Sequence, residues 1–313
     1  MRGAGAAVPQ WDDVELVVVA YRSRAQVEAM LAGLPANLPV AVVDNSDGAD
    51  GLGALVTARP HGRYLSGGGV GFARAANLGA RTSTASVVVF VKPSARPTTA
   101  DLATLVEDVV TDPGCSASAA VLTDPEGRSQ RGVGGWEPSP RRALVHAVGL
   151  HKLWPHAGIY ARPPIGVPLE VDWVNGGVMA VRRETFLELG CFDEGFHVFN
   201  EDMAFGWASR QHGLRQRLRT DVAVPSAVGG SGGPALDLWR LRGASMARYL
   251  DRYHPGRRVG NEVAVVVLAL GSLARAAVQT LRRDGDEARA SRVYARGLLT
   301  RRAYMEGRLV SRR

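Results

Sequence analysis

The chain has 313 residues, of which 46% are hydrophobic, so it can bury a substantial core as one large domain or as one domain with an appendage. Its two cysteines, Cys115 and Cys191, are too few for a disulfide framework and lack metal-ligand spacing, which makes a reducing cytosol the default compartment. The net charge of +8 is uneven: residues 237–313 hold 17 Arg, no Lys and 7 acids, a net of +10, which leaves about −2 for the rest.

The first part of the chain alternates strand and helix patterns. Residues 14–21, VELVVVAY, are a short, continuous β-branched run that predicts a buried strand. Residues 25–34 then have helical spacing, and residues 40–46 predict a second strand that ends at Asp44 and Asn45. This order predicts a β-α-β unit in a parallel sheet, where ligands bind beyond the carboxyl ends of the strands.

A glycine-rich loop follows and runs into a helix over residues 67–80, GGGVGFARAANLGA. Residues 86–98 predict a third strand with a polar turn that contains Lys92 and Ser94. Since this turn and Asp44 both follow parallel strands, we expect them at the same edge of the sheet. Lys92 is one of only two lysines in the chain.

The second half of the chain begins with a segment rich in Gly, Pro and Arg, residues 112–170, which predicts loops and a flap. Residues 171–196 predict a strand, a turn and a helix, and residues 201–213 predict a helix that Gly213 ends. From Asp237 onward the chain is expected to be predominantly helical.

Four stretches share their order and spacing with a known family: VVVAYRS, VVDNSDG with GGGVGFARAANLGA, WVNGGVMAVRRETFLELGCFDEGF, and NEDMAFGWASRQHG. On these residues the chain resembles the inverting family 2 glycosyltransferases and is most similar to rhamnosyltransferase-type members from actinobacteria. The resemblance implies an α/β structure with the GT-A nucleotide-diphosphosugar transferase fold, whose sheet is Rossmann-like and mostly parallel. It also implies a glycosyltransferase domain over residues 1–235 and a basic helical extension over residues 236–313.

The resemblance assigns roles to individual side chains. Asp202 corresponds to the catalytic base, which would take the proton of the acceptor hydroxyl while that oxygen attacks the anomeric carbon, and Glu201 would orient it. Asp44, with Asn45 beside it, lies where the family contacts the base or ribose of the nucleotide. The other implied binding positions are in the glycine-rich loop, in the helix after it and in the segment that lines the donor–acceptor cleft: Gly68, Gly71, Asn77, Trp173, Asn175, Gly176 and Gly177.

The chain departs from the family pattern where the metal usually binds. Family members have an acid at the place of Ser94, an Asn or Asp at Lys92, often an acid at Ala204, and often a histidine at Val228. Mg²⁺ and Mn²⁺ need oxygen ligands, and the usual ones are missing here. One hypothesis is a metal-independent enzyme in which Lys92 faces the diphosphate as a point charge. The alternative is a catalytically reduced, glycosyltransferase-like protein that binds a nucleotide sugar or serves as a scaffold.

Simpler roles remain open for the same side chains. Asp44 is also suited to capping a turn, Lys92 to a solvated turn, and an acidic pair to the first turn of any helix. Phe205 and Trp207 are expected in the core.

The helical tail also has two interpretations. Val263–Leu270 are apolar with arginines on both sides, which is typical of a basic amphipathic segment on an anionic membrane surface. The alternative is a helix packed against the body or against a second subunit in a homodimer. Without aromatic interleaving or a known motif, no nucleic-acid partner is expected. The first residues lack a signal-length apolar core, and no apolar run reaches about 18 residues, so no spanning helix is expected.

These features predict transfer of a sugar such as rhamnose from a dTDP- or UDP-sugar to a hydroxyl acceptor. The acceptor would be a polyprenyl-linked saccharide of the cell envelope or a small natural product. The protein would be cytoplasmic, with a peripheral place at the inner face of the cell membrane.

Overall fold

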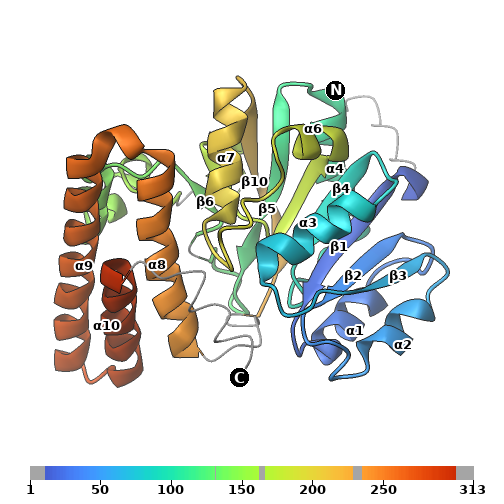
Figure 1. Cartoon of the computed structure of the whole chain (residues 1–313), viewed down its shortest axis with the longest axis horizontal. Coiled ribbons are helices and arrows are strands. Elements are labelled where there is room, and N and C mark those ends of the chain that lie inside the picture. Colours follow the sequence, from blue (N-terminus) through green and yellow to red (C-terminus); the bar gives the residue numbers. More distant parts are fainter. Residues whose placement is uncertain (1–10, 131, 162–165, 228–234, 301–313) are drawn as a thin grey trace.

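The computed structural model describes residues 11–130, 132–161, 166–227 and 235–300, and the description below concerns these residues. Its centre is an eight-stranded sheet in the order β3-β2-β1-β4-β9-β5-β10-β7, with helices packed against it (Figure 1). The strands of this sheet are β1 (Val14–Ala20), β2 (Val40–Asp44), β3 (Gly62–Ser66), β4 (Val87–Val91), β5 (Cys115–Thr123), β7 (Leu169–Val171), β9 (Val178–Arg182) and β10 (Arg215–Pro225). Most neighbours run parallel, whereas β9 is antiparallel to β4 and β5, and β7 is antiparallel to β10.

The strands at the centre of the sheet are apolar because both of their faces are covered. β4, VVVFV, is buried at every position, and β1 is buried at all but one. The remaining strands, β6 (Gly134–Gly135) and β8 (Trp173–Val174), form a separate two-stranded ladder. The helices of this body are η1 (Trp11–Asp13), α1 (Arg24–Ala32), α2 (Leu52–Thr57), α3 (Phe72–Thr82), α4 (Thr99–Thr111), α6 (Arg183–Glu188) and α7 (Glu201–Gln211).

The C-terminal helices form a bundle beside the body, at the left of Figure 1. It consists of α8 (Ala235–Tyr253), η4 (Pro255–Arg257), α9 (Arg258–Leu281) and α10 (Gly285–Thr300). The segment between β6 and β7 adds α5 (Pro140–Ala147), η2 (Leu150–Lys152) and η3 (Pro155–Ala157), and α5 packs along α9.

Two kinds of contact join this bundle to the body. A second apolar cluster contains Trp173 and Met203 of the body together with Met246 and Leu268 of the bundle. Beside it, the Glu137 carboxylate accepts a hydrogen bond from the Tyr249 hydroxyl at 2.8 Å and contacts His254 Nε2 at 2.6 Å, and it pairs with Arg210 of α7. The bundle is therefore packed on the body through shared core and polar contacts.

The predicted strands β1, β2, β4 and β9 and the helices α3, α4, α6 and α7 are confirmed, as are the helices of the tail. The prediction of loops over residues 112–170 is wrong for β5 and for α5. β5 has the sequence CSASAAVLT, whose small residues give little β signal, yet all nine of its residues are buried. β3, GRYLS, was not predicted either.

The expectation that no helix could span a membrane also needs correction. By length and composition α9 is long and apolar enough to cross one, and a third of its most apolar window is buried inside the protein. The expectation was wrong because it required an unbroken apolar run, and Glu262 and Arg275 interrupt the run in α9.

Candidate active site

The start of α7 places two acids at the end of the sheet where the parallel strands finish. Phe199 and Asn200, the two residues before the helix, both have left-handed φ angles, of 70° and 68°. Such conformations cost free energy in residues other than glycine and concentrate at functional sites. They turn the chain so that Glu201 and Asp202 form the first turn of α7, where they are only 5% and 7% exposed.

Asp202 is held by donors from two segments. Its Oδ1 accepts a hydrogen bond from the Met203 N–H at 2.8 Å, and its Oδ2 accepts one from Asn175 Nδ2 at 3.3 Å. Burial raises the pKa of Asp202 to about 6, although the Met203 N–H and the charge of Arg242 act in the opposite direction. The carboxylate is therefore mostly ionised at neutral pH and has a proton affinity suited to a general base.

Glu201 is the more strongly perturbed of the two acids. Burial, and after it the charge of Asp202, raise its pKa well above the ordinary value. Its Oε2 has no hydrogen-bond partner within the described ranges. Two adjacent buried carboxyl groups do not both ionise readily, and the more strongly raised pKa of Glu201 makes it the acid of the pair that binds a proton first.

Lys92 follows β4 and enters the same region past Gly177. A Cβ atom at Gly177 would lie 2.8 Å from both Asn175 Oδ1 and Leu122 Cδ1, so glycine is needed for these two neighbours, while Lys92 Cδ would be in ordinary contact at 3.5 Å. No hydrogen bond to its ammonium group is formed by the residues that the structure describes. Burial and the nearby charge of Arg242 lower the pKa of Lys92 to about 8.

Arg242 of α8 brings a second cation to the cleft. Its guanidinium carbon lies 4.7 Å from the centre of the Phe199 ring and 5.0 Å from that of Trp239. Its charge lowers the pKa of both Asp202 and Lys92, which places it near both. No carboxylate in the described part of the chain pairs with it. Arg242 could not be singled out from the sequence, because it is one of 17 arginines in the tail and lies outside the matched stretches.

Asp44 organises the turn after β2. It is fully buried and accepts hydrogen bonds from the Ser46 N–H and hydroxyl, the Gly48 N–H and the Tyr64 hydroxyl. Burial alone would raise its pKa, but these donors outweigh it and lower the pKa. The geometry thus supports the turn-capping alternative. Contact of Asp44 with a nucleotide stays a prediction, and it would require that donors of the nucleotide replace some of these protein donors.

Asn45 and the glycine-rich loop bring the turn after β2 against the segment before α7. Asn45 Nδ2 donates to the Gly71 carbonyl at 3.0 Å, and the Phe72 N–H donates to the His197 carbonyl at 2.6 Å. Gly71 has φ +95°, and a Cβ atom there would lie 2.5 Å from His197 Nδ1. Gly68, with φ +64°, donates its N–H to Asp47 at 3.1 Å. Glycine at 71 is thus required for this close approach.

Two of the predicted binding residues are structural in this arrangement. Asn77 is fully buried and exchanges two hydrogen bonds with the backbone of Phe192, at 2.9 and 3.0 Å, so it joins α3 to the loop before α7. Trp173 is 2% exposed, packs in the second apolar cluster and donates to the Trp136 carbonyl at 3.3 Å. Both side chains are occupied by packing and backbone contacts, and their contact with a nucleotide sugar stays a prediction.

The other predicted positions contact Asp202 or link the ends of neighbouring strands. Asn175 bonds Asp202 and accepts the Gly177 N–H at 2.9 Å, and the backbone of Gly176 helps to lower the pKa of Asp202. Ser94 Oγ lies 3.1 Å from Ser226 Oγ and so links the turn after β4 to the residue that follows β10. Val228 lies outside the described residues.

Whether a divalent metal ion binds here stays a prediction, since Val228 lies outside the described residues. No group of three or more His, Cys, Asp or Glu side chains gathers within the described ranges. The charge of Arg242 acts on both Asp202 and Lys92 and would oppose the binding of a cation between them.

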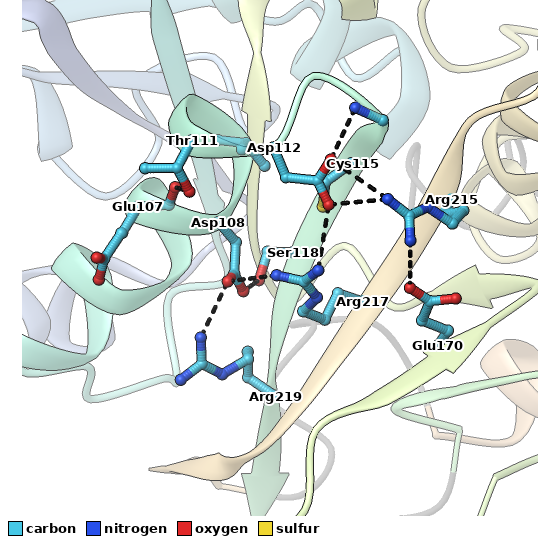
Figure 2. Close-up of polar contacts among 12 residues, drawn as sticks. Glu107, Asp108, Thr111, Asp112, Cys115, Ser118, Glu170, Arg215, Arg217 and Arg219 are labelled. Atoms are coloured by element: carbon cyan, nitrogen blue, oxygen red, sulfur yellow. Dashed lines mark hydrogen bonds and ion pairs between the residues drawn. The ribbon is translucent and has the colours of Figure 1, made fainter. Parts of the chain in front are cut away.

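A second charged cluster lies at the other end of the strands (Figure 2). Arg215, Arg217 and Arg219 of β10 pair with acids of α4 and its neighbours, including Arg217 with Asp108 at 2.7 Å and Arg215 with Asp112 at 3.0 Å. Each of these arginines is already matched by carboxylates, so the cluster stabilises the β10 region and offers no free charge to a ligand.

The sequence matches no protein-family model and no curated protein sequence. Solved structures are similar to it. One is the mannosyltransferase PcManGT from Pyrobaculum calidifontis in complex with GDP-Man and Mn²⁺, with a TM-score of 0.54, 19% identity, and coverage of 92% of this chain and 85% of that chain.

Another is GalNAc-T7 with UDP, GalNAc and Mn²⁺, with a TM-score of 0.51, 15% identity, and coverage of 71% of this chain. The match spans 44% of GalNAc-T7, less than half of its length. At these identities the likeness concerns the fold: a mixed α/β structure with a large, mostly parallel sheet and C-terminal helices, as in GT-A glycosyltransferases.

Proposed function

We propose that the protein is an inverting glycosyltransferase that moves a sugar, such as rhamnose, from a nucleoside-diphosphate donor to a hydroxyl acceptor. One observation carries this proposal: Asp202 is a buried carboxylate with a pKa of about 6, and the charge of Arg242 acts both on it and on the buried Lys92. The fold supports it, because the two similar structures hold GDP-Man in one case and UDP with GalNAc in the other.

The proposed reaction is a single displacement. The Asp202 carboxylate takes the proton of the acceptor hydroxyl while that oxygen forms a bond to the anomeric carbon. The bond between the anomeric carbon and the diphosphate oxygen breaks on the opposite face, which inverts the configuration. The nucleoside diphosphate leaves with the bonding electron pair, and the charges of Lys92 and Arg242 stabilise it.

The reaction would need no metal ion in this form. Lys92 is a compact cation and Arg242 presents a planar fork of donors, and both are recurrent ligands of phosphate groups. Phe199 and Trp239 hold the guanidinium in place, so little conformational entropy is lost when a diphosphate binds.

Within this proposal the donor is a dTDP- or UDP-sugar and the acceptor is a polyprenyl-linked saccharide of the cell envelope. A cytoplasmic protein with peripheral membrane contact would meet such an acceptor. The apolar surface of the C-terminal helices supports that contact.

A second candidate function is binding without turnover, as a glycosyltransferase-like scaffold. It is favoured by Ser94, where the resemblance leads us to expect an acid, and by the saturation of Asp44 with internal hydrogen bonds. Both candidates predict nucleotide binding, so only turnover separates them.

The test is a donor screen with the purified full chain, dTDP-, UDP- and GDP-sugars, and detection of released nucleoside diphosphate and of products by mass spectrometry. Asp202→Asn should abolish release while thermal melting and calorimetric binding of the nucleoside diphosphate persist. Glu188→Gln, an exposed acid of α6, is the matched control and should keep full activity. Turnover by Asp202→Asn at the wild-type rate would refute the base assignment, and binding without turnover in the wild type would favour the scaffold.

A further inference from the structure

The exposed apolar side chains of this protein are concentrated on one part of its surface. In the described part of the chain fifteen large apolar side chains are exposed, and twelve of them lie either in residues 144–154 or in α9. Single exposed apolar residues are common on soluble proteins, but a contiguous group indicates an interaction surface.

The α9 residues form a continuous stripe along the helix. Val259, Val263, Val266, Leu270 and Leu273 follow one another at spacings of four, three, four and three residues, and all are exposed by 44% or more. This spacing puts them on a single face. The face continues to Leu281, which is 85% exposed, so it extends over roughly 33 Å of helix.

The opposite side of α9 is packed inside the protein. Ala264, Val265 and Leu268 are buried, and α9 contacts α5, α8 and α10. The exposure of the stripe therefore does not result from poor packing of α9. It is the outer face of a helix whose inner face is fully used.

The exposed face of α5 adjoins this stripe. Pro140 lies against Gly260 and Ala147 against Gly271, so the two helices run side by side in the same direction. Leu144 and Val148 are 53% and 59% exposed on the outer side of α5. In parallel neighbours whose inner sides both face the protein, the outer sides form one surface. We call the exposed apolar residues of 144–154 and of 259–281 the α5–α9 face.

Positive charge borders this face. Exposed cations occur beside each of its segments: Arg141, Lys152, Arg257, Arg258, Arg282 and Arg283. The exposed acids Asp284, Asp286 and Glu287 follow the last two, so the excess of positive charge lies at residues 141, 152, 257 and 258. Glu262 is the single acid within the α9 sequence. Leu153 and Trp154, 72% and 59% exposed, follow Lys152 directly. Tryptophan beside a basic residue is typical of the boundary between lipid headgroups and acyl chains.

We propose that the α5–α9 face docks on an anionic lipid bilayer, with α9 lying in the plane of the interface and its flanking arginines and Lys152 at the lipid phosphates. Charge selects this occupant over a second copy of the chain. A second copy would bring the cations at residues 141, 152, 257 and 258 close to their own duplicates, whereas lipid phosphates neutralise them. Because the inner face of α9 is packed, docking needs no unfolding of the bundle, in contrast to a spanning helix.

The test is flotation of the purified full chain with vesicles of phosphatidylcholine alone and with vesicles that also contain phosphatidylglycerol. The protein should float with the anionic vesicles at low ionic strength, and binding should weaken as salt is added. Val266→Ser with Leu270→Ser should lower the partition coefficient about tenfold or more, since each change replaces inserted apolar surface by a hydroxyl. Val110→Ser with Val167→Ser is the matched control, because these residues are equally exposed outside the face, and it should bind like the wild type.

Trp154→Ala tests the same face outside α9 and should also weaken binding, so the result does not depend on the helix variant alone. Size-exclusion chromatography with light scattering measures whether a second copy of the chain binds to this face instead. Absence of flotation with both kinds of vesicle, or a dimer that the α9 variant dissociates, would overturn the proposal. Nucleoside-diphosphate binding is measured in parallel with all variants and should not change, so that a failure here is distinguishable from a failure of the proposed transfer activity.

Discussion

The pH dependence of turnover should report directly on the charges of the cleft. The pKa of Asp202 is raised from 3.8 to about 6, and a base works when ionised, so kcat/KM should rise as the pH increases through about 6. The pKa of Lys92 is lowered from 10.5 to about 8, and a diphosphate-binding lysine works when protonated, so kcat/KM should fall as the pH increases through about 8. The expected profile is a bell with its maximum near neutrality.

Arg242→Gln is the informative perturbation of this profile. Two causes lower the pKa of Lys92 from 10.5 to about 8, burial first and Arg242 second, so the arginine accounts for less than half of that difference. Its removal should therefore move the alkaline limb of the profile to a higher pH by at most about 1 unit, which corresponds to about 1.4 kcal/mol. The charge of Arg242 also lowers the pKa of Asp202, so the acid limb should move upward as well. The whole bell should shift toward higher pH.

The assay is release of nucleoside diphosphate at limiting donor concentration, where kcat/KM reports the free enzyme. Arg248→Gln on the same helix is the control and should leave both limbs in place, because Arg248 is not among the causes of either shift. Lys92→Arg should remove the alkaline limb, since a guanidinium stays charged over this range. A limb near pH 8 that persists in Lys92→Arg would refute the assignment of that limb to Lys92.

Three further outcomes follow from the same contacts. Chelation of divalent cations should leave turnover unchanged, measured by the same release assay; a strict requirement for added Mn²⁺ or Mg²⁺ would contradict the role given to Lys92 and Arg242. Gly71→Ala should destabilise the protein by roughly 2–3 kcal/mol in urea unfolding, because a positive φ and a contact of 2.5 Å with His197 combine. Gly127→Ala, with φ +76° and open space around it, should show the strain alone and a smaller loss. Glu137→Gln should lower stability by on the order of 2 kcal/mol, seen in thermal melting, because Arg210 loses its charged partner and an NH2 donor replaces one of the two oxygens that serve Arg210, Tyr249 and His254. An unchanged melting temperature would show that the apolar cluster alone holds the bundle.

Sequence patterns predicted the strands whose apolar residues are large and β-branched. β1 and β4 were predicted correctly because short runs rich in valine favour a buried strand over a helix or a loop. β5 was missed although it is buried along its whole length, because serine and alanine carry no such signal. Its place is set by pairing with β10 and β9, which are distant in the chain, and a pattern within one segment contains no information about such partners.

The site was predictable only where its residues are local in sequence. Glu201 and Asp202 are adjacent, so a short motif finds both. Asn77 and Trp173 were placed in the binding site by their motifs, but their hydrogen bonds run to Phe192 and Trp136, and only the folded chain shows which side of an element a side chain takes. Lys92 was singled out because lysine is rare here, and the structure adds the missing reason, a nearby arginine from α8.

The position of Arg242 gives the C-terminal helices a role beyond that of an appendage. An appendage could be removed without effect on the cleft, but α8 carries one of the two cations and also buries Met203 and Trp173 of the body. The same bundle presents the outer face of α9. A chain that ended near residue 235 would leave Lys92 without its neighbouring charge and expose the second apolar cluster to water, so it should lose solubility and donor binding together. Within the proposed reaction the helices would belong to the catalytic unit, since the sheet and α7 alone would supply the base but only one of the two cations assigned to the diphosphate.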